Sequence, residues 1–267
     1  MVDIVAKKRF GQNFLKDTSI IKQIVKSMPN DKLQIVEIGP GLGDLTEELL
    51  RHYSVIAYEV DIDLYRYLQD KFRLEIDEGK LTLKLCDVLE FWEDSSLCEK
   101  EYKIVANLPY NIGTNIILRA LKDQNCKHIT AMLQKEVALK FCAVAGEREY
   151  SALGVLRESV ANARVLLEVP PTSFEPIPKV DSIVFEIDKF ANIENNGFES
   201  FLRVAFNSPR KMALKNLTSL CSRDTLETLF DEIHLEKNYR PHQISSRYYH
   251  LIFEKLKKGD FYGKHTK

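Results

Sequence analysis

The feature that most constrains the fold is an alternation of strand-like and helical runs in the first half of the chain. Strand-like runs rich in Val, Ile and Leu occupy residues 33–39, 54–61, 80–88, 102–108 and 128–134, and helical patterns occupy residues 17–28, 43–52, 62–74, 112–122 and 135–145. Near-continuous apolar runs are typical of strands that are buried on both faces. Strands and helices in this order predict an α/β fold with a doubly wound, mostly parallel sheet.

The rhythm changes after residue 150. The stretch "EYSALGVLRESVANA" is typical of a helix, and residues 164–187 contain two strand-like runs around a proline-rich loop. Two strands without a crossover helix predict an antiparallel hairpin at the sheet edge. The polar run "NIENNG" resembles a linker, and helical patterns follow at residues 198–207, 210–220, 223–232 and 244–257. We therefore expect a larger domain at residues 1–190 and a small all-α domain at residues 191–267.

Charge is distributed unevenly along the chain. Residues 189–267 carry 14 Lys/Arg and 9 Asp/Glu, a net charge of +5, although the whole chain has a net charge of −1. A basic tail on an acidic body favours contact with nucleic-acid phosphates, and an ordinary solvated helical surface would give the same count. Five cysteines without a C-x-x-C pair predict reduced thiols in the cytoplasm and no metal site. We expect no membrane contact, because no apolar run approaches the roughly 18 residues of a membrane span and no secretory signal opens the chain.

A glycine-rich turn follows the first predicted strand of the sheet. In "VEIGPGLGDLT", Gly39, Gly41 and Gly43 form a G-x-G-x-G pattern, and such turns serve packing as often as binding. Glu59 ends the next strand, 20 residues after Gly39, where an acid can bind ribose hydroxyls. Asp87 ends the third strand and can accept a hydrogen bond from an adenine amine. Together these acids predict a ligand that contains adenosine.

S-adenosylmethionine fits this pattern better than NAD. A dinucleotide needs its pyrophosphate bound, usually by a G-x-G-x-x-G turn, and that spacing is absent. S-adenosylmethionine has no phosphate and needs a glycine turn for its amino-acid end. An NAD-dependent reductase is therefore not expected.

The stretch "NLPY", residues 107–110, ends the fourth predicted strand. The adenine N6 amine is a poor nucleophile, because its lone pair is delocalised into the ring. The side-chain oxygen of Asn107 and the carbonyl oxygen of Leu108, fixed by Pro109, can accept its two hydrogens and position the lone pair. Tyr110 offers a face for a flipped-out base. The alternative is a structural proline turn with a packed tyrosine.

At this point the sequence resembles a known family. The stretches "KKRFGQNFLKD", "VEIGPGLGDLT", "YEVD", "CDV", "NLPYNIGTNI", "MLQKEVA" and "VPPTSFEPIPKVDS" occur in the order and spacing of the ribosomal RNA adenine dimethyltransferases, most similarly to the small-subunit branch. The resemblance is strong over residues 7–188 and loose in the tail. It implies a seven-stranded Rossmann-like methyltransferase domain that uses S-adenosylmethionine. The implied reaction is N6,N6-dimethylation of two adjacent adenosines in the 3′-terminal hairpin loop of 16S rRNA, within a pre-30S particle.

The resemblance also implies roles for individual residues. The catalytic motif falls on Asn107, Leu108, Pro109 and Tyr110, and cofactor contacts fall on Gln12, Asn13, Leu15, Gly39, Gly41, Glu59, Asp87 and Asn107. Tyr110 and Phe174 would lie on opposite sides of the target base. Arg210 and Lys211 would contact RNA, although Pro209 replaces a basic residue that family members usually carry. The last stretch, "GDFYGKHTK", has no counterpart in the family. Independently of the resemblance, the run Lys7, Lys8 and Arg9 is usual for a solvated arm, and beside a cofactor site it could also bind phosphates. We expect a monomer.

Two alternatives stay open at the level of sequence. One is a 23S rRNA adenine N6-methyltransferase of the macrolide-resistance type, which shares the motifs of the larger domain and would differ in the tail. The other is a non-catalytic RNA-binding assembly factor on the same fold. The intact acids and the complete "NLPY" motif argue against the second alternative.

Overall fold

The computed structural model describes residues 7, 11–92, 96–194 and 197–258. Lys8, Arg9, part of the "NIENNG" linker and the "GDFYGKHTK" stretch therefore lie outside the described residues. Contacts divide the chain into two compact units. Unit 1 comprises residues up to Ala138 together with Ala161–Asn192, and unit 2 comprises Leu139–Val160 and the chain from Ile193 onward. This grouping adds residues 139–160 to the C-terminal unit, and the division into domains at residues 190 and 191 stays a prediction.

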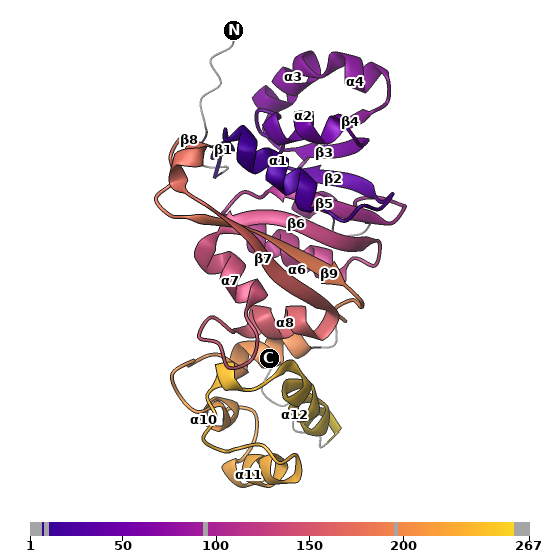
Figure 1. The fold of residues 1–267 in the computed structure, drawn as a ribbon. Coiled ribbons are helices and arrows are strands. Elements are labelled where there is room, and N and C mark those ends of the chain that lie inside the picture. Colours follow the sequence, from indigo (N-terminus) through magenta and orange to yellow (C-terminus); the bar gives the residue numbers. More distant parts are fainter. Residues whose placement is uncertain (1–6, 8–10, 93–95, 195–196, 259–267) are drawn as a thin grey trace. The chain divides into compact units, whose positions relative to one another are not determined.

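Unit 1 is built on one seven-stranded sheet with the order β4-β3-β2-β5-β6-β9-β7 (Figure 1). The strands are β2 (Gln34–Ile38), β3 (Val55–Glu59), β4 (Leu81–Leu85), β5 (Tyr102–Asn107), β6 (Cys126–Gln134), β7 (Ala161–Val169) and β9 (Ser182–Lys189). The five strands from β4 to β6 run parallel, and β9 is antiparallel to both β6 and β7. The predicted doubly wound sheet with an antiparallel hairpin at its edge is confirmed.

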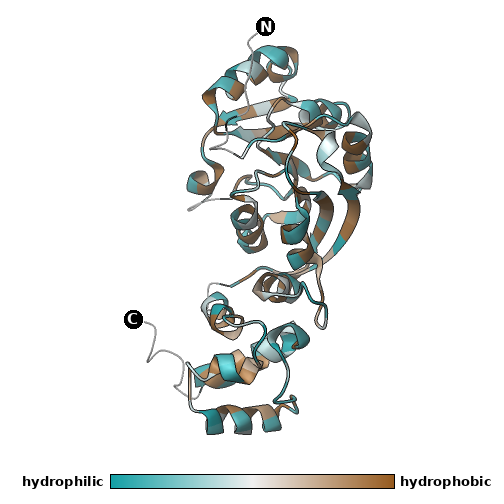
Figure 2. Cartoon of the chain, turned by 90° about the vertical axis from the view of Figure 1, so that its left-hand side faces the viewer, coloured by the Kyte–Doolittle hydropathy of each residue, from teal (hydrophilic) through white to brown (hydrophobic). Residues whose placement is uncertain are grey.

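The helices of unit 1 match the predicted ones and add two short helices. They are α1 (Thr18–Ser27), α2 (Asp44–Leu50), α3 (Ile62–Lys71), α4 (Arg73–Asp77), α5 (Val88–Phe91), α6 (Gly113–Lys122) and the start of α7 (Lys135–Cys142). Asp17 caps α1, because its side chain accepts hydrogen bonds from the N–H groups of Ser19 and Ile20. Figure 2 shows hydrophobic and hydrophilic residues alternating along these helices, so that one face of each can be buried. No helix in the described part of the chain is both long and apolar enough to cross a membrane.

The helix predicted for "EYSALGVLRESVANA", residues 149–163, ends earlier than expected. Helix α8 spans Ala152–Val160, and the following residues extend into β7, where Ala161 pairs with Lys189 of β9. Pairing in the sheet therefore overrides the local preference of "ANA". A second small sheet was not predicted: β1 (Phe14–Leu15) pairs with β8 (Phe174–Glu175), which follows a short 3-10 helix at Pro171–Ser173. Two-residue strands are too short to show any periodicity in the sequence.

Unit 2 is helical. Beyond α8 it contains α9 (Phe198–Ala205), α10 (Ala213–Leu217), α11 (Arg223–Glu232), a 3-10 helix (Pro241–Gln243) and α12 (Ser246–Lys258). Aromatic rings form its core: the centroid of Phe201 lies 6.3 Å from that of Tyr249 and 5.5 Å from that of Phe253. Edge-on and tilted ring pairs at these separations stabilise helix packing beyond the area that they bury.

The order of the strands points to the functional end of unit 1. The chain adds β3 and β4 on one side of β2, and β5 and β6 on the other. The direction of winding therefore reverses between β2 and β5. Open α/β sheets bind ligands at the carboxyl ends of the strands beside such a reversal.

Candidate active site

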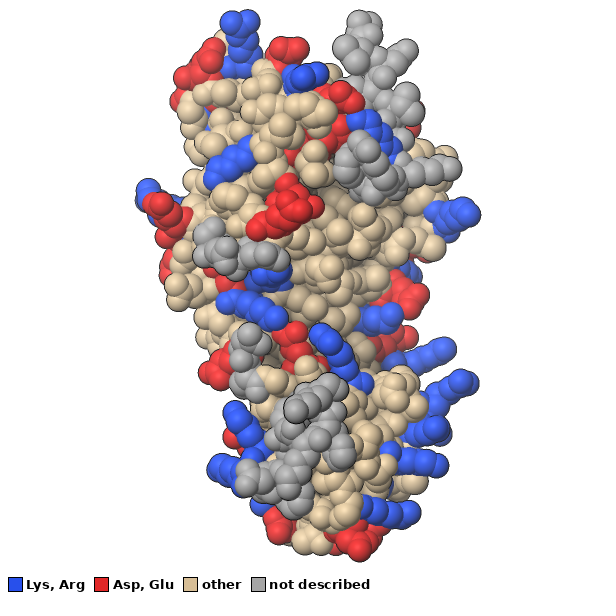
Figure 3. Space-filling model, turned by 180° about the vertical axis from the view of Figure 1, so that it is seen from behind, with Lys and Arg blue, Asp and Glu red and all other residues tan. Residues whose placement is uncertain are grey.

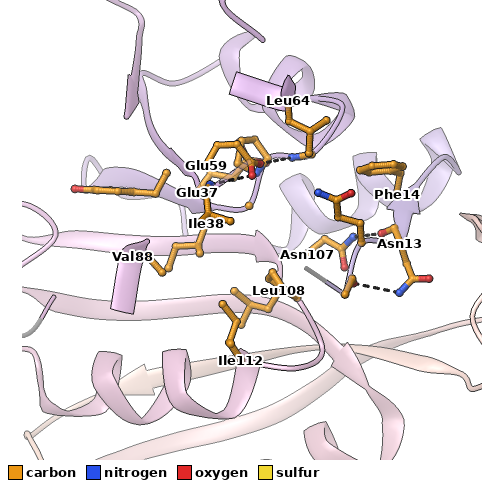
Figure 4. A pocket seen from close by; sticks show the side chains of 18 of the residues that line it. Asn13, Phe14, Glu37, Ile38, Glu59, Leu64, Val88, Asn107, Leu108 and Ile112 are labelled. Atoms are coloured by element: carbon orange, nitrogen blue, oxygen red, sulfur yellow. Dashed lines mark hydrogen bonds between the residues drawn. The ribbon is translucent and has the colours of Figure 1, made fainter. Parts of the chain in front are cut away.

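A cavity of about 320 Å³ lies at this reversal, entirely within unit 1 (Figure 4). The carboxyl ends of β2, β3, β4 and β5 line it, together with residues 11–15 from the N-terminal segment. It brings together most of the residues predicted from sequence, namely Gln12, Asn13, Leu15, Gly39, Gly41, Glu59, Asp87, Asn107, Leu108, Pro109 and Tyr110. Residues up to 98 positions apart therefore meet in one place, as expected for a ligand site.

The glycine turn after β2 needs its glycines for conformation and for space. Gly39 and Gly41 have φ angles of +68° and +61°, which lie in the left-handed region. A Cβ atom at Gly41 would lie 3.0 Å from a ring carbon of Phe14. The turn can therefore pack closely under the N-terminal segment only with glycine at this position.

Glu59 ends β3 with a buried carboxyl group that is 4% exposed. One carboxyl oxygen accepts hydrogen bonds from the N–H groups of Val60 and Asp61, both at 2.9 Å, and the other accepts one from Gly41 at 3.4 Å. Burial raises the pKa of Glu59 to about 7, against the effect of these three backbone donors. The carboxyl group is therefore rigidly held at the wall of the cavity, where it can bind hydroxyl groups.

Glu37 is a cavity residue that the sequence analysis missed. Its carboxyl group is 1% exposed and accepts a hydrogen bond of 2.7 Å from the Thr46 hydroxyl. Burial raises its pKa to about 8, and repulsion from nearby Glu59 adds to this increase. An acid inside an otherwise apolar strand is unusual, and this was the signal in the sequence. Figure 4 shows Glu37 and Glu59 as neighbours on one wall.

Acidic groups dominate the charge of the cavity. Glu37, Asp44, Glu59 and Asp87 line it, and none of the described lining residues is Lys or Arg. Asp87 is exposed and caps α5 by accepting a hydrogen bond of 2.9 Å from the N–H of Leu89. Because phosphate groups need basic or dipolar partners, this cavity suits a cationic, phosphate-free ligand with hydroxyl and amine donors.

The Asn107 side chain at the end of β5 is held in one orientation. Its Nδ2 atom donates a hydrogen bond of 3.0 Å to the carbonyl oxygen of Asn13. A carbonyl oxygen can only accept, so this contact fixes which end of the amide carries the NH₂ group. The amide oxygen then faces away from Asn13 and stays available as an acceptor. The neighbouring backbone is also fixed, since the Leu108 N–H donates to the Met132 carbonyl at 3.1 Å.

The two aromatic residues predicted to contact the base differ in their surroundings. Tyr110 lines the cavity, and its hydroxyl group lies 2.7 Å from the Ser182 Oγ atom. Phe174 is 3% exposed, packs in the hydrophobic core and pairs with Leu15 across the small sheet. It does not belong to the cavity lining. The structure therefore gives Phe174 a packing contact, and its stacking on a base stays a prediction.

Arg210 and Lys211 are exposed residues of unit 2, between α9 and α10. On the face shown in Figure 3, Lys and Arg side chains of this unit stand out together with Asp and Glu side chains. On that face the basic residues of the tail do not form a single compact patch.

Comparison with known proteins identifies relatives over nearly the whole chain. The model of the family described as ribosomal RNA adenine dimethylase matches residues 5–258. "Ribosomal RNA small subunit methyltransferase A" of Sulfurimonas denitrificans is 49% identical over 254 residues, which cover 95% of each chain. The protein of the same name from Helicobacter hepaticus is 45% identical and covers 100% of this chain and 96% of its own.

Solved structures show the same fold. A dimethyladenosine transferase from Plasmodium falciparum has a TM-score of 0.77 with 20% identity, covering 92% of this chain and 98% of that one. The 23S rRNA methyltransferase ErmE has a TM-score of 0.68 with 23% identity, covering 92% of this chain and 100% of that one. At these identities the two structures support the fold alone.

Proposed function

The chain belongs to the ribosomal RNA adenine dimethylase family, and from that premise we propose how the residues of its cavity carry out the reaction. The protein is an enzyme that uses S-adenosylmethionine to dimethylate adenines of ribosomal RNA. Its relatives at 45–49% identity are named as small-subunit methyltransferases, which supports two adjacent adenosines in the 3′-terminal hairpin loop of 16S rRNA as the target. The 23S alternative has only a likeness in fold to support it.

The cavity residues fit S-adenosylmethionine by their chemistry. The Glu59 carboxyl group would accept hydrogen bonds from the ribose hydroxyls, and Asp87 would accept one from the adenine amine. Gly39 and Gly41 would let the amino-acid end approach the backbone, beside Gln12, Asn13 and Leu15 of the N-terminal segment. The lining acids would favour the cationic groups of the ligand. When bound, the cofactor supplies a methyl group on a sulfonium, which makes it an electrophile.

The single observation that carries the mechanism is the hydrogen bond from Asn107 Nδ2 to the Asn13 carbonyl. With its NH₂ group engaged there, the Asn107 amide presents its oxygen as an acceptor for one hydrogen of the target amine. The carbonyl oxygen of Leu108 would accept the other, because Pro109 fixes the backbone beyond it. Two acceptors hold the amine nitrogen pyramidal and direct its lone pair, and fixed positioning of this kind supplies much of the rate.

Tyr110 would hold the target base in place. Its hydroxyl bond to Ser182 fixes the ring at the edge of the cavity, one residue beyond Pro109. An adenine that leaves its stack can lie against such a ring, because every base has a π face. The ring needs no ionisation for this role, and burial raises the pKa of the Tyr110 hydroxyl.

Unit 2 would contact the RNA. The tail has a net positive charge, and Arg210 and Lys211 are exposed there. Contacts of this kind with phosphates give affinity that falls with salt. We place the enzyme in the cytoplasm as a monomer that acts on a pre-30S particle, because its target is an RNA of the small ribosomal subunit.

The test of this mechanism is methyl transfer by an Asn107→Ala variant. Labelled S-adenosylmethionine and undermethylated small subunits are the substrates, and calorimetry measures cofactor affinity in parallel. Loss of one positioned acceptor should lower the rate by roughly 10²–10³ while cofactor binding is largely kept. A variant that keeps more than about a tenth of the rate would contradict the acceptor role.

A further inference from the structure

Asp61 lies two residues beyond Glu59, just outside the cavity, and its carboxylate is fully occupied. It is 3% exposed and directly precedes α3. One carboxylate oxygen accepts hydrogen bonds from the Lys7 Nζ atom at 2.6 Å and from the N–H of Asp63 at 3.1 Å. The other accepts a hydrogen bond of 3.1 Å from the Gln12 side chain. A buried carboxylate with donors from Lys7, Gln12 and Asp63 can fix the positions of the segments that carry those donors.

What Asp61 holds is the N-terminal segment. Gln12 uses both ends of its amide: its Nε2 atom donates to Asp61, and its Oε1 atom accepts a hydrogen bond of 2.7 Å from the backbone N–H of Lys7. The next residue, Asn13, provides the carbonyl oxygen that accepts from Asn107 Nδ2 at 3.0 Å. Two consecutive residues therefore connect the end of β3 with the end of β5.

The strand order shows where this connection runs. β2 lies between β3 and β5, so residues 12 and 13 pass over its carboxyl end, where the glycine turn begins. The next residue, Phe14, packs so closely on the turn that a Cβ at Gly41 would lie 3.0 Å from its ring. On the other side, a Cβ at Gly11 would lie 3.0 Å from the side-chain oxygen of Asn111. The segment is therefore confined on both sides, and a displacement at Gln12 has to move the Asn13 carbonyl.

We propose that Asp61 is a positioning residue for methyl transfer, which acts through Gln12 and the Asn13 carbonyl to keep the Asn107 amide oxygen directed at the target amine. Asp61 touches neither cofactor nor substrate in this scheme. The proposal rests on the proposed role of Asn107. It makes rate, more than cofactor affinity, the quantity that depends on Asp61.

The substitutions at Asp61 separate this role from helix capping. Serine keeps a side-chain acceptor for the N–H of Asp63 but is too short to reach Gln12. Asparagine also keeps that acceptor, but its NH₂ group replaces the oxygen that accepts from Gln12 Nε2, so two donors face each other there. At saturating cofactor, Asp61→Ser and Asp61→Asn, which both keep the cap and lose the acceptor for Gln12, should each lower the single-turnover rate by about tenfold or more, since small displacements in an active site are costly. Asp63→Asn is the matched control, because Asp63 shares the Lys7 contact and does not bind Gln12. It should stay within about twofold of the unaltered rate.

A second measurement tests the route through Asn107. The residual rate of Asn107→Ala is compared with that of the double variant Asn107→Ala, Asp61→Ser. If Asp61 acts through Asn107, the second substitution should change the residual rate by less than about twofold. Melting temperatures of all variants show the folded fraction, to which the rates are normalised.

Three results would overturn the proposal. They are a normal single-turnover rate for Asp61→Ser, a loss confined to cofactor affinity, and a further large loss in the Asn107→Ala background. A fully active Asn107→Ala variant would instead refute the proposed catalytic mechanism, so the two failures are distinguishable.

Discussion

Replacing Glu37 by glutamine should make the cofactor-free protein more stable, and increasingly so as pH rises. Glu37 is buried beside Glu59, and its carboxyl group accepts a hydrogen bond from the Thr46 hydroxyl. Glutamine has nearly the same volume, and its carbonyl oxygen can accept the same bond from Thr46. The substitution therefore removes an ionisable group and leaves the packing in place.

The magnitude follows from the pKa of Glu37 in the folded chain, which burial raises from 4.5 to about 8. Between these two values the folded state binds more protons than the unfolded state, so stability falls as pH rises through that window. At about 1.36 kcal/mol per pKa unit, the full penalty above pH 8 is on the order of 3–5 kcal/mol. Below about pH 4.5 both states are protonated, and the penalty disappears.

Urea unfolding of both proteins without cofactor, at pH 5 and at pH 8, measures this difference. We expect nearly equal free energies of unfolding at pH 5 and a more stable Glu37→Gln variant at pH 8. The exposed Glu90 gives a matched control, and Glu90→Gln should show no such change with pH. If the two stability curves stay parallel from pH 5 to pH 8, the reasoning that Glu37 is a destabilising buried acid is refuted.

The same substitution should weaken cofactor binding. Above about pH 8, where Glu37 is ionised, the cavity would lose one of its four negative charges and with it part of its attraction for a cation. A variant that is more stable and binds cofactor less well is the expected trade between stability and function.

Substitutions at three further residues test the proposed site. Glu59→Gln should weaken cofactor binding about tenfold at pH 8, because it removes a charge-assisted acceptor. The cofactor affinity of the unaltered protein should fall as pH drops through the Glu59 pKa of about 7. Equal affinities of the two proteins in calorimetry at pH 8 would remove Glu59 from the ribose site. Tyr110→Phe should keep most of the methylation rate and Tyr110→Ala should lose about 1–3 kcal/mol of stacking, so a strongly impaired Phe variant would assign the role to the hydroxyl. Phe174→Ala should cost about 3–5 kcal/mol of stability in denaturant unfolding, and a normal rate per folded molecule would remove Phe174 from base stacking.

The sequence by itself was sufficient for the features that depend on local pattern. Continuous apolar runs marked the parallel strands, and the acid or amide that follows each run marked its carboxyl end. Because parallel strands present these ends at one edge of the sheet, Glu59, Asp87 and Asn107 could be placed near one another before any contact was known. The glycine turn could also be recognised from the sequence, because positive φ angles leave few choices of residue.

Only the tertiary structure decided the features that depend on burial and on contacts distant in sequence. Phe174 looked like a loop residue facing the base, yet pairing of β8 with β1 buries it. The contact of Asn13 with Asn107 joins positions 94 residues apart, and no periodicity encodes it. The pKa of Glu37 likewise depends on the chain closing around its carboxyl group. A local pattern fixes which face of an element is apolar, but packing of the elements decides which side chains lose water and which become neighbours.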